Sequence, residues 1–425
     1  MMPRILILHY TPPGVIGGVE GIIQQHIRLL TDRDFPVEVV AGRPGQIEVP
    51  FHLIPEIDAA RPENVQIEDE LSHGVVSEQF EATRRVIMEK LEPVAARADA
   101  VIAHNAFTLH FSLPLTSVLW DLATERSPGS MIAWCHDLSW TNPLYIPAMY
   151  DAFPWNLLRL PAPNTRYVTV SGERRSELSA LWGDGGDRIV VIPNGVDPVK
   201  LLRLSSFASE LVSRYGLFDR DIVLLLPVRI TRRKNIEAGI RAIRSLRDRG
   251  LDVCFLISGP VAPHHPARSR SYLAELKALR ADLNVSEEVV FLADELGENL
   301  DDQAVAELFA VSDVLLFPSA QEGFGLPILE AGVARLPVVL SDIPIFREVG
   351  GSDIRTFPLD CAADTIAAEI LRSLDNGPSR LYRRALREFR WDAIVDRKIL
   401  PLLPGYGTWS QPRELASTVD DEPRS

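Results

Sequence analysis

Several features are scarce in this sequence of 425 residues. It has only three cysteines, Cys135, Cys254 and Cys361, which stand far apart without a CxxC pair and so indicate neither a disulfide framework nor a zinc site. No apolar run approaches the ~20 residues of a membrane-spanning helix. The run Ile5–Leu8 is too short for a signal peptide. We therefore expect a soluble, cytoplasmic protein.

Positive charge is also scarce, and lysine is the rarest source of it. The chain has 44 Lys and Arg against 58 Asp and Glu, a formal net charge of −14, and only five of its basic residues are lysines. An acidic chain is a poor general ligand for nucleic acid or for an anionic membrane surface. We expect no nucleic-acid partner, and peripheral membrane contact is not indicated, although a local basic site is compatible with this total.

What is abundant is a regular alternation of strand and helix patterns, within an ordinary globular composition of 46% hydrophobic residues. Near-continuous apolar segments indicate strands buried on both faces, as in a parallel sheet covered by helices. The expected strands are Ile5–Leu8, Val37–Val40, Ala100–Ala103, Met131–Trp134, Tyr167–Val170, Ile189–Ile192, Ile222–Val228, Val253–Ile257, Val289–Leu292, Val314–Phe317 and Val338–Leu340. This rhythm predicts an α/β fold.

The alternation restarts after a segment rich in turn-forming residues, Pro193–Pro198. We therefore predict two Rossmann-like, doubly wound domains that face a cleft. The expected limits are residues 1–200 for the N-terminal domain and 201–385 for the C-terminal domain. A further helix is expected over 386–404, and the polar tail 405–425 is expected to be disordered.

The strongest motif follows the predicted strand Val314–Phe317, at the carboxyl end where open α/β sheets bind ligands. It contains two glutamates around a glycine turn, and reads Glu322, Gly323, Phe324, Gly325, Leu326, Pro327, Ile328, Leu329 and Glu330. Pro327 suits the first position of a helix, which would leave Glu330 within the first turn. Glycines let the backbone approach a ligand, and the first helical N–H groups favour an anion. Glu322 and Glu330 could then accept hydrogen bonds from a sugar and a ribose on either side of a phosphate.

Two weaker motifs also follow predicted strands. Arg229 and Lys234 come directly after Ile222–Val228 and would offer a guanidinium fork and a point charge to a diphosphate, although a solvated basic loop would have the same composition. Gly17 and Gly18 lie between the first strand and the first helix, the usual place for a phosphate loop, but a flexible turn explains them equally well.

A histidine, His136, follows the strand Met131–Trp134 and could position or polarise an acceptor hydroxyl near neutral pH. His9, His104 and His110 have similar positions relative to predicted strands. No HExxH motif occurs, so we expect no metal site. The absence of GxGxxG argues against an NAD-dependent dehydrogenase.

Together these motifs resemble the retaining glycosyltransferases of family 4, which have the two-domain GT-B fold. The most specific element is the family's Glu-x7-Glu, matched by Glu322 and Glu330, and the resemblance extends over roughly residues 4–400. The Arg-x4-Lys of Arg229 and Lys234, the loop at Gly17 and Gly18, and His136 occur in the family's order.

The resemblance implies a role for each matched position. The donor diphosphate would be held by Arg229 and Lys234, with backbone amides around Gly17 and Gly18 and along Phe324, Gly325 and Leu326. Glu330 would bind the donor ribose, and Glu322 with Gly323 the donor sugar. His136, Glu322, Arg229 and Lys234 would be the catalytic residues. The N-terminal domain would receive the acceptor, and the terminal helix 386–404 would pack back on it.

The implied reaction, a step of carbohydrate biosynthesis, moves a hexose from a UDP-, GDP- or ADP-linked sugar to a hydroxyl acceptor, a small molecule or a glycan. It would retain the anomeric configuration by front-face substitution and need neither a cofactor nor a metal. Two alternatives remain at this point: a nucleotide-sugar epimerase, and a non-catalytic scaffold that binds a sugar nucleotide.

Overall fold

The computed structural model describes residues 2–14, 17–183, 189–262 and 266–406. Its contacts divide these residues into two compact units, which are described one at a time. The first contains the chain up to Gly195 and again from Trp391, and the second runs from Val196 to Arg390. The predicted disordered tail falls, apart from Gly405 and Tyr406, outside the described residues.

Seven of the described strands form the sheet of the first unit, in the order β3-β2-β1-β4-β5-β6-β7, and all neighbours are parallel. The strands are β1 (Ile5–Leu8), β2 (Val37–Ala41), β3 (Phe51–Leu53), β4 (Ala100–His104), β5 (Met131–Cys135), β6 (Thr165–Thr169) and β7 (Ile189–Val191). The helices are α1 (Gly18–Thr31), α2 (Pro62–Ser72), α3 (Glu78–Ala95), α4 (Leu113–Glu125), α5 (Gly172–Trp182) and α16 (Trp391–Ile394). Single turns of 3-10 helix lie at Pro55–Ile57, His110–Ser112, Ser139–Thr141, Ile146–Ala148 and Trp155–Arg159.

Six of the described strands form the sheet of the second unit, also parallel, in the order β10-β9-β8-β11-β12-β13. The strands are β8 (Ile222–Leu226), β9 (Val253–Ile257), β10 (Val289–Phe291), β11 (Val314–Phe317), β12 (Val338–Ser341) and β13 (Arg355–Phe357). The helices are α6 (Pro198–Leu202), α7 (Ser206–Tyr215), α8 (Ile236–Asp248), α9 (Pro266–Asp282), α10 (Leu292–Leu296), α11 (Asp302–Val311), α12 (Leu326–Ala334), α13 (Pro344–Gly350), α14 (Ala363–Leu374) and α15 (Gly377–Glu388). Both units are thus Rossmann-like, as the sequence predicts.

The two faces of the first sheet are both buried, because successive side chains along each strand point to opposite sides. Leu6 and Leu8 of β1 pack with α3 and α4 residues such as Leu91 and Leu119. Ile5 and Ile7 pack on the other face, with residues of α1 such as Ile23. The expected two-sided burial of the parallel sheet is therefore confirmed.

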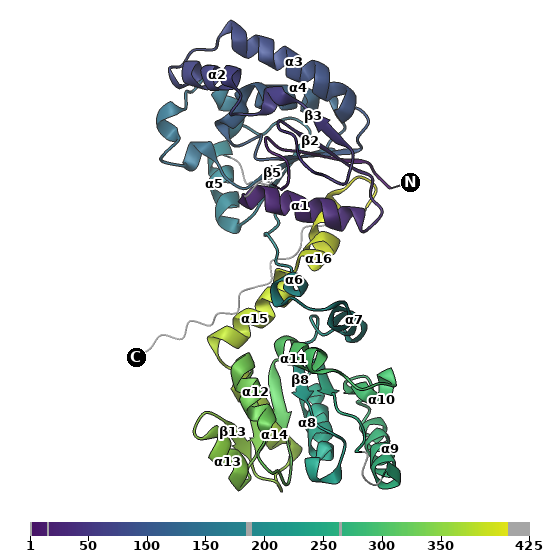
Figure 1. The fold of residues 1–425 in the computed structure, drawn as a ribbon. Helices are drawn as coiled ribbons and strands as arrows, with labels where there is room; N and C mark the ends of the chain where they lie inside the picture. The colour runs from purple at the N-terminus through teal and green to yellow at the C-terminus, as the bar shows by residue number, and fades with distance from the viewer. Residues whose placement is uncertain (1, 15–16, 184–188, 263–265, 407–425) are drawn as a thin grey trace, which may run out of the picture. The chain divides into compact units, whose positions relative to one another are not determined.

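The second of these faces is completed by the C-terminal segment of the chain. The segment consists of α16 followed by a wider helical turn, Val395–Ile399, and a 3-10 turn, Leu400–Leu402. Its residues Trp391, Ile394 and Val395 are buried in the same cluster as Ile23 and Ile27 of α1. Figure 1 shows α16, in yellow, beside the purple α1.

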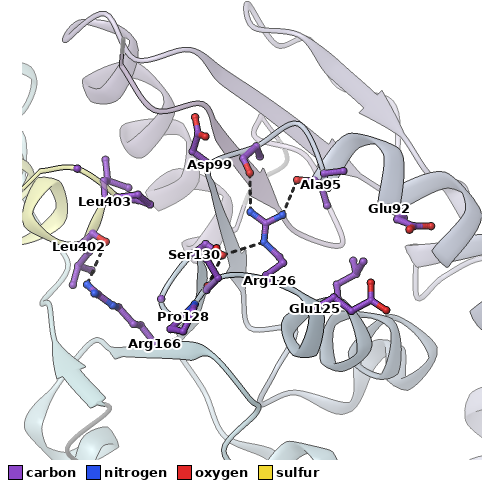
Figure 2. A pocket seen from close by; sticks show the side chains of 17 residues that line it. Glu92, Ala95, Asp99, Glu125, Arg126, Pro128, Ser130, Arg166, Leu402 and Leu403 are labelled. Atoms are coloured by element: carbon purple, nitrogen blue, oxygen red, sulfur yellow. Dashed lines mark hydrogen bonds between the residues drawn. The ribbon is translucent and has the colours of Figure 1, made fainter.

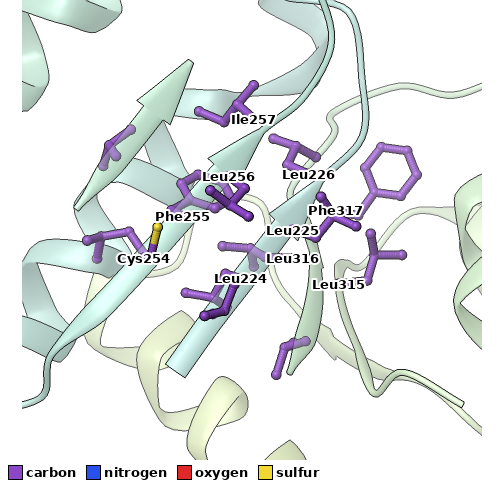
Figure 3. Packing of buried hydrophobic residues seen from close by; sticks show 14 of the residues in the cluster. Leu224, Leu225, Leu226, Cys254, Phe255, Leu256, Ile257, Leu315, Leu316 and Phe317 are labelled. Atoms are coloured by element: carbon purple, nitrogen blue, oxygen red, sulfur yellow. The ribbon is translucent and has the colours of Figure 1, made fainter. Parts of the chain in front are cut away.

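A single hydrophobic cluster fills the second unit. The central strands β8, β9 and β11 supply completely buried side chains, and Figure 3 shows their leucines and phenylalanines interleaved between the strands. Leu225, Leu256 and Leu316 have no exposed surface. Burial of each such side chain contributes about 1.5–3 kcal/mol, so these strands form the most stable part of the scaffold that carries the site.

The helices begin where short polar side chains precede them. A serine, aspartate or asparagine oxygen at the position before the helix accepts a hydrogen bond from a first-turn N–H, which satisfies one of the four free donors there. This pattern is present at Ser77, Ser171, Asp197, Ser205, Asp301 and Asn376. α12 differs, because it begins after Gly325, whose φ of +89° is left-handed, and no side chain caps it.

Candidate active site

The strand order of the second unit brings two predicted motifs together. In this sheet β8 lies between β9, the next strand in the chain, and β11, the fourth strand of the unit. The crossovers therefore reverse direction between β8 and β11, and ligands bind at the carboxyl end of such a reversal point. Arg229 and Lys234 follow β8, and Glu322 follows β11.

Lys234 and Glu322 form a direct ion pair at this edge. Both side chains are more than nine-tenths buried, with 9% and 7% of their surface exposed. Arg233 donates to the other carboxylate oxygen of Glu322 at 2.9 Å and to the carbonyl of Gln321 at 3.0 Å. The two loops are also joined through their backbones, because Ala320 N–H donates to Arg233 O at 2.8 Å.

The electrostatics keep both partners of this pair charged. Burial alone would raise the pKa of Glu322, but the hydrogen bond from Lys234 and the nearby positive charges hold that pKa below its ordinary value. Burial lowers the pKa of Lys234, and Glu322 opposes the shift. The ammonium group also lies 5.0 Å from the centre of the Phe317 ring, a cation–π contact.

Arg229 and Glu330 contrast with this pair. Both are exposed, and neither side chain has a partner among the described residues. Glu330 lies in the second turn of α12, since the helix begins at Leu326, so its expected position in the first turn is wrong. Pro327 stands at the second helical position and not the first.

The glycine turn between Glu322 and α12 contains backbone donors that other backbone groups do not use. Within the described part of the chain, the N–H groups of Phe324, Gly325 and Leu326 have no backbone partner. Phe324 and Leu326 are exposed, at 53% and 57%. Such N–H groups at the start of a helix favour an anion. A side chain at Gly323 would meet open space, whereas one at Gly325 would be strained by its φ and would press on Phe346 at 3.0 Å.

Sequence reasoning missed Gly259, which supports the Arg229 loop. A Cβ on Gly259 would lie 2.1 Å from the carbonyl oxygen of Val228, so only glycine fits beside the Val228–Arg229 peptide. The neighbouring Pro260 accepts a hydrogen bond from Ile230 at 2.9 Å. The signal in the sequence is a Ser-Gly-Pro turn directly after the strand Val253–Ile257.

In the first unit, His136 lies among other histidines at the carboxyl end of β1, β4 and β5. Its Nε2 is 3.1 Å from Nδ1 of His104, and the two rings are stacked. One of these two nitrogens therefore carries the proton and donates the hydrogen bond to the other. His9 Nδ1 lies 3.1 Å from the backbone oxygen of His104, and His26 of α1 packs against the His104 ring. His110 lies apart from this group and its Nδ1 is 2.8 Å from Ser139 Oγ.

Burial keeps these histidines neutral. It lowers the pKa of His136 and of His26 to about 3, and the pKa of His104 falls well below its ordinary value. A neutral His136 can donate or accept one hydrogen bond but carries no charge near pH 7. Asn105, with a left-handed φ of +59°, fixes the turn by accepting hydrogen bonds from the N–H groups of His136, at 2.8 Å, and Asp137.

The glycine turn at Gly17 and Gly18 starts α1, with Gly17 at the position before the helix. A Cβ on Gly17 would lie 2.0 Å from the Glu20 carboxylate, which folds back over the turn and accepts a hydrogen bond from Thr11. The N-terminus of α1 therefore already faces a negative charge from its own chain.

A hollow of about 620 Å³ lies in the first unit, at the amino ends of β4, β5 and β6 (Figure 2). Arg126 lies in it but is occupied, since it donates to the carbonyls of Ala95 and Ala98 at 2.8 and 2.7 Å and to Ser130 Oγ. Arg166 donates to the carbonyl of Leu402. These cations hold the fold together, and ligands of parallel sheets bind at the opposite edge.

No group of three or more His, Cys, Asp or Glu within the described residues is arranged to hold a metal ion. In the same part of the chain, no helix is both long and apolar enough to cross a membrane.

Two family models match the chain, and together they span most of it. Residues 209–388 match "Glycosyl transferases group 1", and residues 16–200 match "Glycosyltransferase Family 4".

Curated relatives include glycosyltransferases from three organisms. The chain is 29% identical to one from Methanocaldococcus jannaschii over 55% of this chain and 58% of that protein. It is 41% identical to the serotype-specific mannosyltransferase WbdA of Escherichia coli, over 65% of this chain and 34% of that protein. It is 24% identical to the mannosylglucosylglycerate synthase of Thermotoga maritima, over 83% of this chain and 82% of that protein. The chain thus spans less than two thirds of the length of the first two.

Solved structures that match include a glycosyltransferase from Rickettsia africae, at 16% identity, 94% and 98% coverage of the two chains and a TM-score of 0.35. HepE of Anabaena, in complex with UDP, matches at 17% identity, 92% and 97% coverage and a TM-score of 0.35.

Proposed function

Since the chain belongs to the family 4 glycosyltransferases with the GT-B fold, we propose that it transfers a hexose from a nucleotide-diphosphate sugar to a hydroxyl acceptor. The observation that carries the proposal is the grouping at the ends of β8 and β11. The same sheet edge carries the buried Lys234–Glu322 pair, an exposed Arg229 and the N–H groups before α12, and neither Arg229 nor these N–H groups have a partner within the described residues.

Each of these groups has a part in the proposed reaction. The diphosphate lies against Arg229, Lys234 and the amides of Phe324, Gly325 and Leu326, and Glu330 accepts hydrogen bonds from the ribose. Glu322, already oriented by Lys234 and Arg233, accepts hydrogen bonds from the donor sugar. Donors and charges that are fixed before the reaction stabilise the charge that develops on the leaving group.

The proposed step balances without a redox partner. The bond between the anomeric carbon and the diphosphate oxygen breaks, and the acceptor oxygen bonds to that carbon on the same face. The acceptor proton passes to the departing phosphate, so the products are a glycoside with retained configuration and a nucleoside diphosphate. In this proposal Arg229 and Lys234 supply the positive charge, and no metal is required.

The donor is tested by thermal unfolding of the full chain with UDP-, GDP- and ADP-linked glucose and mannose. Mannose is included because two of the relatives are named for mannosyl transfer. A true donor raises the melting temperature by mass action, and Lys234→Ala removes that increase. If no sugar nucleotide changes the melting temperature, the proposal is wrong as to its ligand.

The chemistry is tested by incubating the identified donor with candidate acceptors, with and without EDTA. We expect EDTA to leave the rate unchanged, and we expect NMR to report the same anomeric configuration in product and donor. An inverted product would overturn front-face substitution, and loss of the rate in EDTA would overturn the metal-free step.

A further inference from the structure

A pocket of about 580 Å³ opens within the first unit, at the carboxyl ends of β1 and β4. Its volume lies in the range of roughly 300–1,000 Å³ that small-molecule sites occupy. The residues that line it come from loops after β1, β2, β3, β4 and β5 and from the start of α1, and they include Tyr10, Glu20, Arg43, Asp58, Phe111 and Tyr145.

One wall of the pocket is aromatic. The ring of Phe111 lies 6.1 Å from that of Tyr10 and 6.0 Å from that of Tyr145, and His110 packs edge-on against Phe111 and Tyr145. Phe111 is 37% exposed although it lies in this cluster. The face of an aromatic ring is electron-rich, and it therefore attracts the polarised C–H groups on the apolar face of a pyranose ring.

The polar part of the lining consists mainly of hydrogen-bond acceptors. Glu20 and Asp137 present carboxylates, and Asn105 and Asn142 are amides. Glu20 is held in place by a hydrogen bond from Thr11, and Asn142 by the N–H of Leu144, which its side-chain oxygen accepts at 3.0 Å. The carboxylates as acceptors and the NH2 groups of Asn105 and Asn142 as donors, opposite an aromatic wall, are suited to the hydroxyl groups along the edge of a sugar ring.

The charge of the pocket disfavours an anion. Its lining contains the three carboxylates of Glu20, Asp58 and Asp137 against one arginine, Arg43. That arginine is paired with one of these carboxylates, because its Nε donates to Asp58 at 2.8 Å. Asp58 is fixed in turn, since it also accepts from the N–H of Ala60 at 3.0 Å. A phosphate in this pocket would face net negative charge, three carboxylates against one guanidinium.

We propose that this pocket binds the acceptor, and that the acceptor is an uncharged pyranose ring of a glycan or glycoside and not a phosphorylated sugar or polyol. The identification of the bound sugar as the acceptor rests on the proposed function. The expected preference for a neutral sugar over a phosphorylated one can be measured without a donor. Phe111 is then a specificity-determining residue, because it provides the exposed ring on which the sugar stacks.

The test measures binding to the full chain without any sugar nucleotide, by saturation-transfer NMR and titration. The probes are the methyl α-glycosides of glucose, mannose and galactose, with glucose 6-phosphate, mannose 6-phosphate and inositol 1-phosphate as charged counterparts. We expect at least one neutral glycoside to bind about tenfold more tightly than every phosphorylated probe, because a phosphate would be buried beside unpaired like charge.

Two variants locate the site. Phe111→Ala should weaken binding of the neutral glycoside about tenfold through loss of the stacking surface, whereas Phe111→Tyr should retain it. Leu144→Ala, at a residue 83% exposed beside the pocket wall, is the matched control and should leave affinity unchanged. Circular dichroism and melting temperature establish that each variant is folded.

Each adverse result is decisive. Equal or tighter binding of a phosphorylated probe overturns the selectivity, and absence of binding by all three neutral glycosides overturns the ligand class. Unchanged affinity in Phe111→Ala overturns the location. Failure of the proposed function is seen separately, because the sugar-nucleotide experiment reports on Lys234 in the other unit and requires no acceptor.

Discussion

The two units have the same sheet topology but opposite chemistry at the edge where ligands bind. In both, the first strand of the unit lies between its second and its fourth, so the crossovers reverse at β1/β4 and at β8/β11. At the second reversal the loops carry Arg229, Lys234 and Glu322 as charged groups. At the first, His104 and His136 are buried and neutral.

In the proposed reaction, the difference lets one scaffold take two parts, binding of the donor and binding of the acceptor. The strands provide a rigid edge, and the loops after them decide whether it offers fixed positive charge, or neutral imidazoles, carboxylates and aromatic surface. An anionic diphosphate requires the first kind of edge, and an uncharged sugar ring requires the second. The variants below test whether the cations at one edge and the neutral histidines at the other are both needed.

Lys234→Ala should have the largest effect, a loss of about 10³-fold in kcat/KM, because it removes a fixed cation from the leaving group. It also leaves the Glu322 carboxylate with Arg233 alone, so donor-induced stabilisation should disappear. Steady-state kinetics and thermal shift measure the two effects. Arg232→Ala, at the exposed neighbour paired with Glu275, is the control and should keep both. Turnover within about twofold of the unmodified protein would contradict the site assignment.

His136→Ala should cost somewhat less, about 10²-fold in kcat, through loss of a group beside the reacting hydroxyl. Unlike Lys234→Ala, it should leave donor-induced stabilisation intact, because the proposed donor cations Arg229 and Lys234 belong to the other unit. His52→Ala, at a partly exposed histidine paired with Glu38, is the control. Loss of donor binding in His136→Ala would contradict the proposal that the donor and the acceptor are bound by different units.

Gly325→Ala should destabilise the chain by about 1–3 kcal/mol, because the residue has a left-handed φ of +89° and an added Cβ would press on Phe346. Gly323→Ala, two residues earlier, meets no atom within 4 Å and should be neutral. Urea unfolding measures both. Equal stability of the two variants would show that the turn before α12 is not rigid, and would weaken its part in anion binding.

The smallest effect concerns acid stability. The pKa of His26 is about 3 in the folded protein against 6.5 for an ordinary histidine, so the unfolded chain binds the proton first. Its contribution to stability is therefore complete above pH 6.5 and is lost as pH falls below that value. Neither ring nitrogen of His26 has a hydrogen-bond partner among the residues that the structure describes, so His26→Leu should fold.

His26→Leu should reduce the slope of stability against pH between 6.5 and 5.5 by about 1 kcal/mol per pH unit. Melting temperatures across this range measure it. Within its described residues the second unit contains no histidine, so it offers no comparable loss in this window. An unchanged slope would mean that His26 does not remain neutral in the folded protein.

The central strands could be predicted from the sequence because their apolar runs are nearly continuous. β3 and β13 were not predicted because they are three-residue edge strands and partly exposed. His52 in β3 and Arg355 in β13 also interrupt the apolar pattern. Edge strands bury only part of their surface, so sequence pattern specifies them weakly.

For the candidate site, the sequence predicts which residues belong to it but not how they pair. Nothing in the spacing of Lys234 and Glu322 states that β8 and β11 are neighbours, since strand order depends on the crossovers and not on local pattern. For the same reason the contact between His104 and His136 could not be anticipated. Glu330 was misplaced by one turn because a proline is tolerated at more than one position of a helix start.

The return of Trp391–Leu402 to the first unit has a consequence for how the protein is made. On the ribosome, β1 and α1 emerge before the second unit, yet the face that buries Ile23 and Ile27 lacks its last layer until Trp391–Leu402 has followed that unit. The second unit is contiguous and can complete its core first. The apolar face of β1 and α1 is therefore sealed from water only after the second unit has been translated.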